Sequence, residues 1–227
     1  MVGAHPDDVD FAAAGTVAGW VDAGTAVTYL VLTDGQSGGF DDRVDRSELV
    51  DIRHREQRAA AAAVGVTDVT FLGGIDGELQ VTSDLVRDIV AVIRNVRPQR
   101  VVTQSPERDW GRLQRSHPDH LAAGEATVQA VYPAARNPYA FPELRAMGLQ
   151  PWTVPELWLS GHPDTDHAVD VTDTFDRKLQ AILAHESQHP DPDRLSAGLR
   201  EVSSALARAH GLHKGRLAEA FRVVRVP

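Results

Sequence analysis

The apolar and polar positions of the chain fall into blocks that predict strands and helices in alternation. Dense runs of apolar and β-branched residues at positions 25–33, 69–72 and 100–103 predict buried strands. Apolar residues recur with helical spacing over residues 82–96, and an alanine-rich run at residues 9–23 predicts a helix that packs closely on a sheet. This alternation predicts a Rossmann-like α/β fold, with a mostly parallel sheet and helices on both faces.

The rest of the chain extends this pattern into a single domain that spans residues 1–227. The further predicted elements are helices at 47–64, 121–131, 173–186 and 193–210 and strands at 1–4, 156–160, 168–171 and 221–226. Residues 132–155 hold five prolines and several aromatic residues, which predicts a surface extension or a lid over a site.

The first strand is predicted to be short, because only four residues precede the first polar turn. Parallel strands usually have about five or six residues. We therefore expect either an unusually short first strand or a natural start upstream of Met1.

Composition and charge narrow the class of protein. The chain has 227 residues, enough for one well-buried domain. Its formal net charge of -9 argues against binding nucleic acid or an anionic membrane through bulk electrostatics. The absence of cysteine excludes disulfides, thiolate zinc sites and cysteine nucleophiles. No apolar run predicts a membrane span or a signal peptide, so we expect a cytoplasmic protein, and a homo-oligomer stays open.

The chemistry is concentrated in a polar turn near the start of the chain, formed by His5, Pro6, Asp7 and Asp8. A turn between a strand and a helix lies at the carboxyl edge of a sheet, where open α/β folds bind ligands. One of the two adjacent carboxylates can bind a metal while the other stays free as a base. Capping of the following helix is the simpler alternative for an aspartate at this position.

A second turn, formed by His117, Pro118, Asp119 and His120, repeats this pattern far along the chain. Two histidines three residues apart, beside a carboxylate, are typical of half a metal site. A proline after a histidine suits the first turn of a helix, and helix N-termini favour bound anions. We expect the two turns to meet above one edge of the sheet.

Charged residues on neighbouring elements are weaker candidates. Asp34, Asp76 and Glu78 follow predicted strands, where carboxylates can hold sugar hydroxyls, although turn formation and solvation are the alternatives. Arg53 lies in the middle of a predicted helix that can face the site, with a solvated arginine as the more common alternative. We expect His185 to be a packed or capping histidine near a helix C-terminus.

These motifs resemble those of the PIG-L/LmbE-like zinc N-deacetylases, a family that includes N-acetylglucosaminyl-phosphatidylinositol de-N-acetylases and the deacetylases of mycothiol and bacillithiol synthesis. The turn at His5 is similar to the family's first signature and the turn at His117 to its second. Residues 33–35, 76–79 and 178–188 also resemble family segments and follow in the expected order. The resemblance covers nearly the whole chain and implies an LmbE-like fold.

The resemblance implies a metal site. His5, Asp8 and His120 are similar to the three residues that bind zinc in this family, with Fe²⁺ or another divalent cation as an alternative. Two histidines and one carboxylate leave open positions on the metal, as a catalytic site needs. Non-haem iron oxygenases use the same ligand types, but they usually have a β-sandwich-like fold, which the alternating pattern argues against.

The other three polar residues of the turns receive roles in hydrolysis from the same resemblance. Asp7 is similar to the general base that takes a proton from the attacking water. His117 is similar to the residue that stabilises the oxyanion or protonates the leaving amine, and Asp119 lies where it can orient a histidine. Whether His117 or Asp7 returns the proton to the amine stays open.

The implied function is a metal-dependent hydrolase that removes an N-acetyl or other N-acyl group from a small N-acetylglucosamine-like sugar conjugate. The segment before the second turn, residues 109–116, lacks the tyrosine of the mycothiol-type enzymes, which argues against a mycothiol-pathway substrate. Arg112 or Arg115 can instead meet a polar or anionic substrate group, or be solvated. A thiol-conjugate amidase of the same family and a non-catalytic sugar- or metal-binding module are the alternatives.

Overall fold

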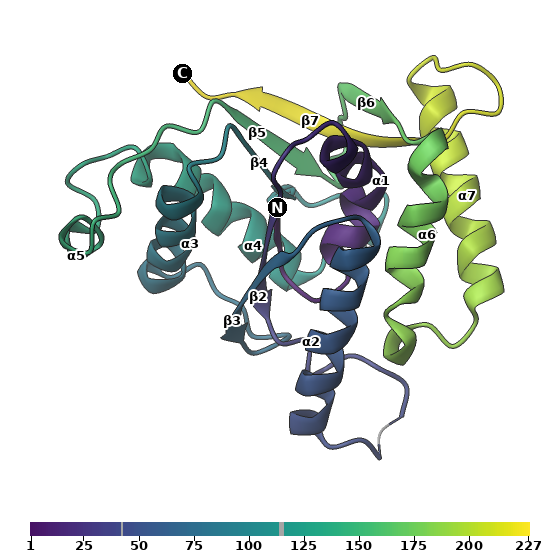
Figure 1. Ribbon diagram of the computed structural model, residues 1–227, viewed down its shortest axis with the longest axis horizontal. Helices are drawn as coiled ribbons and strands as arrows, with labels where there is room; N and C mark the ends of the chain where they lie inside the picture. Colours follow the sequence, from purple (N-terminus) through teal and green to yellow (C-terminus); the bar gives the residue numbers. More distant parts are fainter. Residues whose placement is uncertain (42, 114–115) are drawn as a thin grey trace.

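Strands and helices alternate through the first half of the chain, as the sequence pattern predicts (Figure 1). The computed structural model describes residues 1–41, 43–113 and 116–227. The elements of the first half are β1 (Val2–Gly3), α1 (Asp8–Asp22), β2 (Thr28–Thr33), α2 (Arg46–Ala63), β3 (Asp68–Gly74), α3 (Ser83–Val96), β4 (Arg100–Gln104) and α4 (Pro118–Gln129). The strand β1 has two residues.

The second half contains shorter elements and ends on an antiparallel strand. Its elements are the π-helical turn η2 (Ala130–Ala134), α5 (Pro142–Ala146), β5 (Glu156–Ser160), β6 (His167–Asp170), α6 (Phe175–Leu183), α7 (Pro192–Ala209) and β7 (Ala218–Arg225), with 3-10 turns η3 (Thr172–Thr174) and η4 (Glu186–Gln188). The helix predicted to run to residue 186 ends at Leu183, so that His185 lies beyond it.

The strands form two hydrogen-bonded sets that meet at β1 and β4. In the first set β2 lies between β1 and β3, and all three strands are parallel. In the second set β4 and β5 are parallel, whereas β7 pairs antiparallel with both β5 and β6. The backbone N–H of Ala4, just after β1, donates to Oε1 of Gln104 at the end of β4, 3.0 Å away. The predicted mostly parallel sheet is confirmed, and the antiparallel edge is an addition to it.

Helices cover both faces of this sheet, as predicted. Consecutive side chains of a strand point to opposite faces, and in β2 Tyr29 and Leu30 belong to different apolar clusters. Leu30 packs with apolar residues of α3 and α4, such as Ile89 and Ala123. Tyr29 packs with residues of α1, α2 and α6. Both faces are therefore closed, and the exposed edge at the carboxyl ends of the strands is where polar turns can gather.

The segment 132–155 packs against the other end of the sheet. The buried guanidinium of Arg94, on α3, donates to main-chain carbonyls of this segment and of η2, namely those of Ala134, Ala135, Asn137 and Ala140. The indole N–H of Trp152 donates to the carbonyl of Pro98, just before β4, at 2.7 Å. These contacts hold the segment at the amino end of β4.

None of the described helices combines the length and the apolar character that are needed to cross a membrane.

Candidate metal and catalytic site

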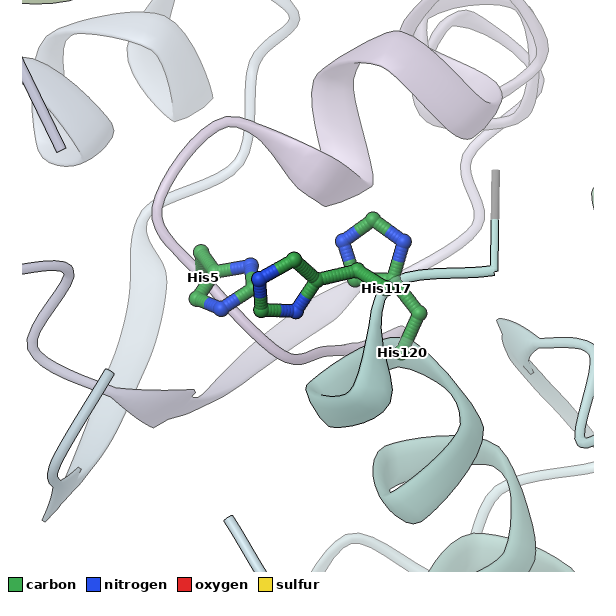
Figure 2. A group of neighbouring side chains, drawn as sticks. All are labelled: His5, His117 and His120. Atoms are coloured by element: carbon green, nitrogen blue, oxygen red, sulfur yellow. The ribbon is translucent and has the colours of Figure 1, made fainter. Parts of the chain in front are cut away.

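Two turns far apart in the sequence meet at the carboxyl ends of neighbouring strands. The first turn, residues 5–8, joins β1 to α1, and the second, residues 117–120, begins α4. Figure 2 shows the rings of His5, His117 and His120 gathered in one place. Their centres lie 4.9 to 5.3 Å apart, and each ring offers a nitrogen within 4.8 Å of the others. The predicted meeting of the two turns is therefore confirmed.

The carboxylate of Asp8 lies between two of these histidines. Its Oδ2 is 3.1 Å from Nδ1 of His5, and its Oδ1 is 3.0 Å from Nε2 of His120. Burial alone would raise the pKa of Asp8, but the charge and hydrogen bonds of His120 and His5 outweigh it and hold the pKa well below its usual value. Asp8 is thus an ionised carboxylate with a ring nitrogen on each oxygen.

The opposite nitrogen of His5 faces two further carboxylates. Its Nε2 lies 3.1 Å from Oδ1 of Asp76 and 3.1 Å from Oδ2 of Asp119, and these three residues form a second group with the spacing of metal ligands. Burial alone would lower the pKa of His5, but hydrogen bonds to Asp76 and Asp8 and their charges raise it to about 11. The carboxylates around His5 therefore make this place strongly favourable for positive charge.

Asp119 is an anchor as well as a partner of His5. Its side chain is buried, and its Oδ2 also accepts the backbone N–H of Gly77 at 2.7 Å. Its Oδ1 accepts the backbone N–H of Leu79 at 3.3 Å. Asp119 thus fixes the loop that follows β3 and orients the His5 ring through Nε2.

His117 occupies the N-cap position of α4. Its Nδ1 accepts the backbone N–H of Asp119 at 3.2 Å, which satisfies one of the unpaired donors of the first helical turn. Because Nδ1 is an acceptor, the neutral ring carries its proton on Nε2. Burial, followed by the charges of His5 and His120, lowers the pKa of His117, which favours this neutral form.

Asp7 has a strained backbone. Its φ of 98° is a conformation that residues with a Cβ rarely adopt, and its side chain makes no hydrogen bond to α1. Its backbone N–H donates to Oε1 of Gln57 at 2.8 Å, and its Oδ2 lies 3.1 Å from Nη2 of Arg53. Burial and the charge of Asp8 raise the pKa of Asp7 to about 6, although Arg53 opposes them. The Asp7 side chain therefore pairs with Arg53 and does not cap α1.

Arg53 is buried beside Asp7, with 3% of its surface exposed. Of the two alternatives for Arg53, the solvated one is wrong, because its guanidinium also donates to the carbonyls of Pro6 and Gly35 and so fills the space between the first turn and the loop after β2. At Gly35, with a φ of 67°, an added Cβ would lie 2.8 Å from this guanidinium. The glycine lets the loop close over Arg53.

The structure divides the weaker candidates. Asp76 joins the site through His5, whereas Asp34 pairs with a histidine of α2, 2.9 Å away. Glu78 and Arg112 have exposed side chains. Arg115 lies outside the described residues.

A row of buried polar side chains behind Asp7 was not predicted as a unit. Gln57 follows Arg53 by one helical turn on α2, and its Nε2 donates to Oδ2 of Asp10 at 2.7 Å. Nε2 of His185 lies 3.0 Å from the same oxygen. His185 is packed just after the C-terminal end of α6, as predicted, and its ring is hydrogen-bonded to Asp10. The i, i+4 spacing on α2 was the available signal for Gln57.

Comparison with known proteins gives one family. The family described as PIG-L: GlcNAc-PI de-N-acetylase matches residues 1–131. A diacetylchitobiose deacetylase of Thermococcus kodakarensis is 34% identical over 187 residues, which cover 82% of this chain and 68% of that protein. A probable N-acetyl-alpha-D-glucosaminyl L-malate deacetylase 2 of Bacillus cereus is 35% identical over 189 residues, which cover 81% of this chain and 80% of that protein.

A solved structure has the same architecture. It is that of N,N′-diacetylchitobiose deacetylase from Pyrococcus horikoshii, which superposes with a TM-score of 0.90 at 28% sequence identity. The match covers 99% of this chain and 82% of that one. The α/β fold predicted from the sequence is therefore that of a deacetylase structure over nearly the whole chain.

Proposed function

Because the chain belongs to the PIG-L family, we propose that it is a metal-dependent deacetylase that hydrolyses the N-acetyl group of a small N-acetylglucosamine-like sugar conjugate. The observation that carries the proposal is the convergence of His5, Asp8 and His120 at the carboxyl edge of the sheet. The relatives support the substrate class, because their names specify acetylated amino-sugar compounds.

His5, Asp8 and His120 are the residues that would hold the metal. Nε2 of His5 is directed at two carboxylates and carries the proton there, so its Nδ1 is the nitrogen that can coordinate. The alternative ligand Asp119 fits less well, because its two oxygens accept main-chain N–H groups. A bound Zn²⁺ or other divalent cation would polarise the amide carbonyl and lower the pKa of a bound water toward about 7.

Asp7 is the proposed general base. It is ionised above about pH 6, and its carboxylate faces Arg53, which keeps it apart from the ligand set. A base with a pKa near the working pH accepts a proton more readily than an ordinary aspartate does. Asp7 therefore takes the proton of the water that attacks the amide.

His117 is the proposed partner of the developing oxyanion. Its Nδ1 is held by the backbone, so its Nε2–H is the donor left for substrate. A donor of this kind contributes about 2.7–4 kcal/mol to transition-state stabilisation in other enzymes. His117 and protonated Asp7 are the two groups proposed to return a proton to the leaving amine, whose departure needs a general acid.

The proposal is tested by measuring metal content and amine release on the same preparation. We expect about one metal ion per chain and release of free amine from N-acetylglucosamine, N,N′-diacetylchitobiose or N-acetylglucosaminyl malate. A chelator should abolish release, and added Zn²⁺ should restore it. The Asp7→Ala protein is the control, because it should bind metal without turnover. Metal binding without release from any of these compounds would contradict the proposal and favour a binding module.

A further inference from the structure

A chain of buried polar side chains connects the strained turn at Asp7 to a distant part of the sequence. We propose that His185, Asp10 and Gln57 are positioning residues that hold Asp7 in its strained conformation, with its carboxylate beside Arg53 rather than on the end of α1. The inference rests on the proposed function only in taking Asp7 as the base. It also assigns a role to the family-like segment at residues 178–188, which lies outside the metal site.

The contacts run without a break from His185 to the Asp7 backbone. Nε2 of His185 lies 3.0 Å from Oδ2 of Asp10, and Nε2 of Gln57 donates to that oxygen at 2.7 Å. Oε1 of Gln57 then accepts the Asp7 N–H at 2.8 Å. The side chains of His185, Asp10 and Gln57 have no exposed surface. Buried polar groups depend on such partners, so each contact constrains the next.

The donor and acceptor at each of these contacts follow from the chemistry of the groups. A carboxylate oxygen only accepts, so Asp10 requires the amide nitrogen of Gln57 to face it. The amide oxygen of Gln57 is then the atom presented to Asp7, whose N–H needs an acceptor. The N–H of His185 provides the second donor to the same Asp10 oxygen and so keeps the carboxylate in place.

The strain at Asp7 explains why such support is needed. A φ of 98° costs free energy for a residue with a Cβ and persists only when the surroundings impose it. Gln57 holds the backbone N–H, while Arg53 holds the side chain. Both residues come from one face of α2, so Asp7 is fixed at two points by a rigid helix.

The helix that carries Asp10 is held from the same side by a second buried contact. Lys178, on α6, lies 2.5 Å from Oε1 of Glu219 and donates to the carbonyl of Phe11 at 2.7 Å. Glu219 in turn accepts the backbone N–H groups of Gly15 and Thr16. The start of α1 is therefore anchored to α6 by Lys178 and to the segment just after α6 by His185.

The test compares His185→Leu with His185→Gln. The first removes the donor to Asp10, whereas the second keeps an N–H group at the position of Nε2. We expect His185→Leu to lower kcat about ten- to a hundred-fold, with KM and metal per chain unchanged, because Asp7 is misplaced while the ligands stay. Exchange of the Asp7 amide with D₂O, followed by NMR, should become about ten-fold faster or more, because its hydrogen bond opens more often. His185→Gln should restore both quantities.

Two further variants keep the test decisive. Gln57→Met removes the acceptor of the Asp7 N–H with little change in volume and should reproduce the effects of His185→Leu even if that variant folds poorly. Arg94→Met is the matched control: it removes a buried polar side chain far from Asp7 and should lower the melting temperature without changing kcat or Asp7 exchange.

The outcomes separate the inference from the proposed function. Unchanged Asp7 exchange in both His185→Leu and Gln57→Met would overturn the positioning role, whatever the activity. A fall in kcat that His185→Gln does not repair would also overturn it. Faster Asp7 exchange in a protein whose wild type releases no amine would support the positioning role and contradict the deacetylase proposal.

Discussion

The two His-Pro-Asp turns have similar sequences and similar places in the fold, but they use their side chains differently. In the second turn His117 caps α4 with its ring at an ordinary φ of -53°, and Asp119 is buried against the loop after β3. In the first turn Asp7 occupies the N-cap position of α1 with a φ of 98° and does not cap the helix. Its carboxylate pairs instead with Arg53.

This difference shows how tertiary contacts can keep a reactive carboxylate from being used as a helix cap. An aspartate at an N-cap usually accepts helix N–H groups and is then unavailable for other contacts. Asp7 is withheld from that role by residues of α2, so its carboxylate stays available as a base. In the second turn His117 caps the helix, and Asp119 after it holds the loop that follows β3 and orients His5. The corresponding aspartates thus differ in chemistry because different distant residues hold them.

Removal of a proposed ligand gives the largest expected effect. His120→Ala should lose both the metal and all amine release above background, because two ligands do not hold a divalent cation at a catalytic site. Metal per chain after dialysis and amine release measure this directly. Asp8→Ala should behave in the same way. Full metal retention by the His120→Ala protein would break the comparison and favour the alternative group of His5, Asp76 and Asp119.

Replacement of the proposed base comes next. Asp7→Asn should keep about one metal per chain and lower kcat by about 10²–10⁴-fold, because an amide cannot accept the proton of water. Steady-state kinetics on metal-loaded protein measures the loss. If Asp7→Asn lost the metal while Asp8→Ala kept it, the roles of the two carboxylates would be reversed.

A smaller effect is expected at the corresponding aspartate of the second turn. Asp119→Asn keeps the shape of the side chain but weakens its hold on the Nε2 proton of His5. Metal affinity should fall about 10–100-fold, because outer partners of metal ligands have effects of this size. Competition with a chelator gives the affinity. A loss of kcat as large as that of Asp7→Asn, at full metal loading, would show that the two aspartates share one role.

The sequence predicts the turns better than their partners. Both turns, the order of strands and helices and the closeness of the two motifs follow from local patterns, since proline and polar residues after apolar runs mark strand ends. The burial of Arg53 does not follow, because α2 is rich in charge and its inward face is chosen by packing against the first turn. The strained φ of Asp7 is likewise a tertiary effect, since aspartate alone would favour an ordinary cap.

The final strands show the same limit. Apolar runs at the end of the chain indicate strands, but their direction depends on which edge of the sheet stays unpaired. β7 pairs antiparallel with β5 and β6, and no local sequence pattern predicts this direction. Segment 132–155 is similar, because its prolines predict irregular structure but leave its position open. The carbonyls that Arg94 satisfies fix it at the amino end of β4.

The N-cap of α3 gives the smallest expected effect, a loss of stability without a loss of activity, and so serves as a control. Thr82 caps α3 by accepting the backbone N–H of Leu85 at 3.1 Å, and it has no proposed role in the chemistry. Thr82→Ala should cost about 0.5–2 kcal/mol of stability. For a chain of this size the melting temperature should then fall by about 2–4 °C per kcal/mol, with kcat unchanged.

The value for Thr82 measures a cap alone, so it allows the two roles of His117 to be separated. His117→Ala loses both the cap and the donor, whereas His117→Asn keeps an N-cap acceptor and loses only the ring. The melting temperature should therefore be restored in the asparagine variant while kcat stays about 10²–10³-fold low. Recovery of turnover together with stability would mean that His117 acts only as a cap. His117 would then have only a structural role, whereas Asp7 of the first turn would take part in the chemistry.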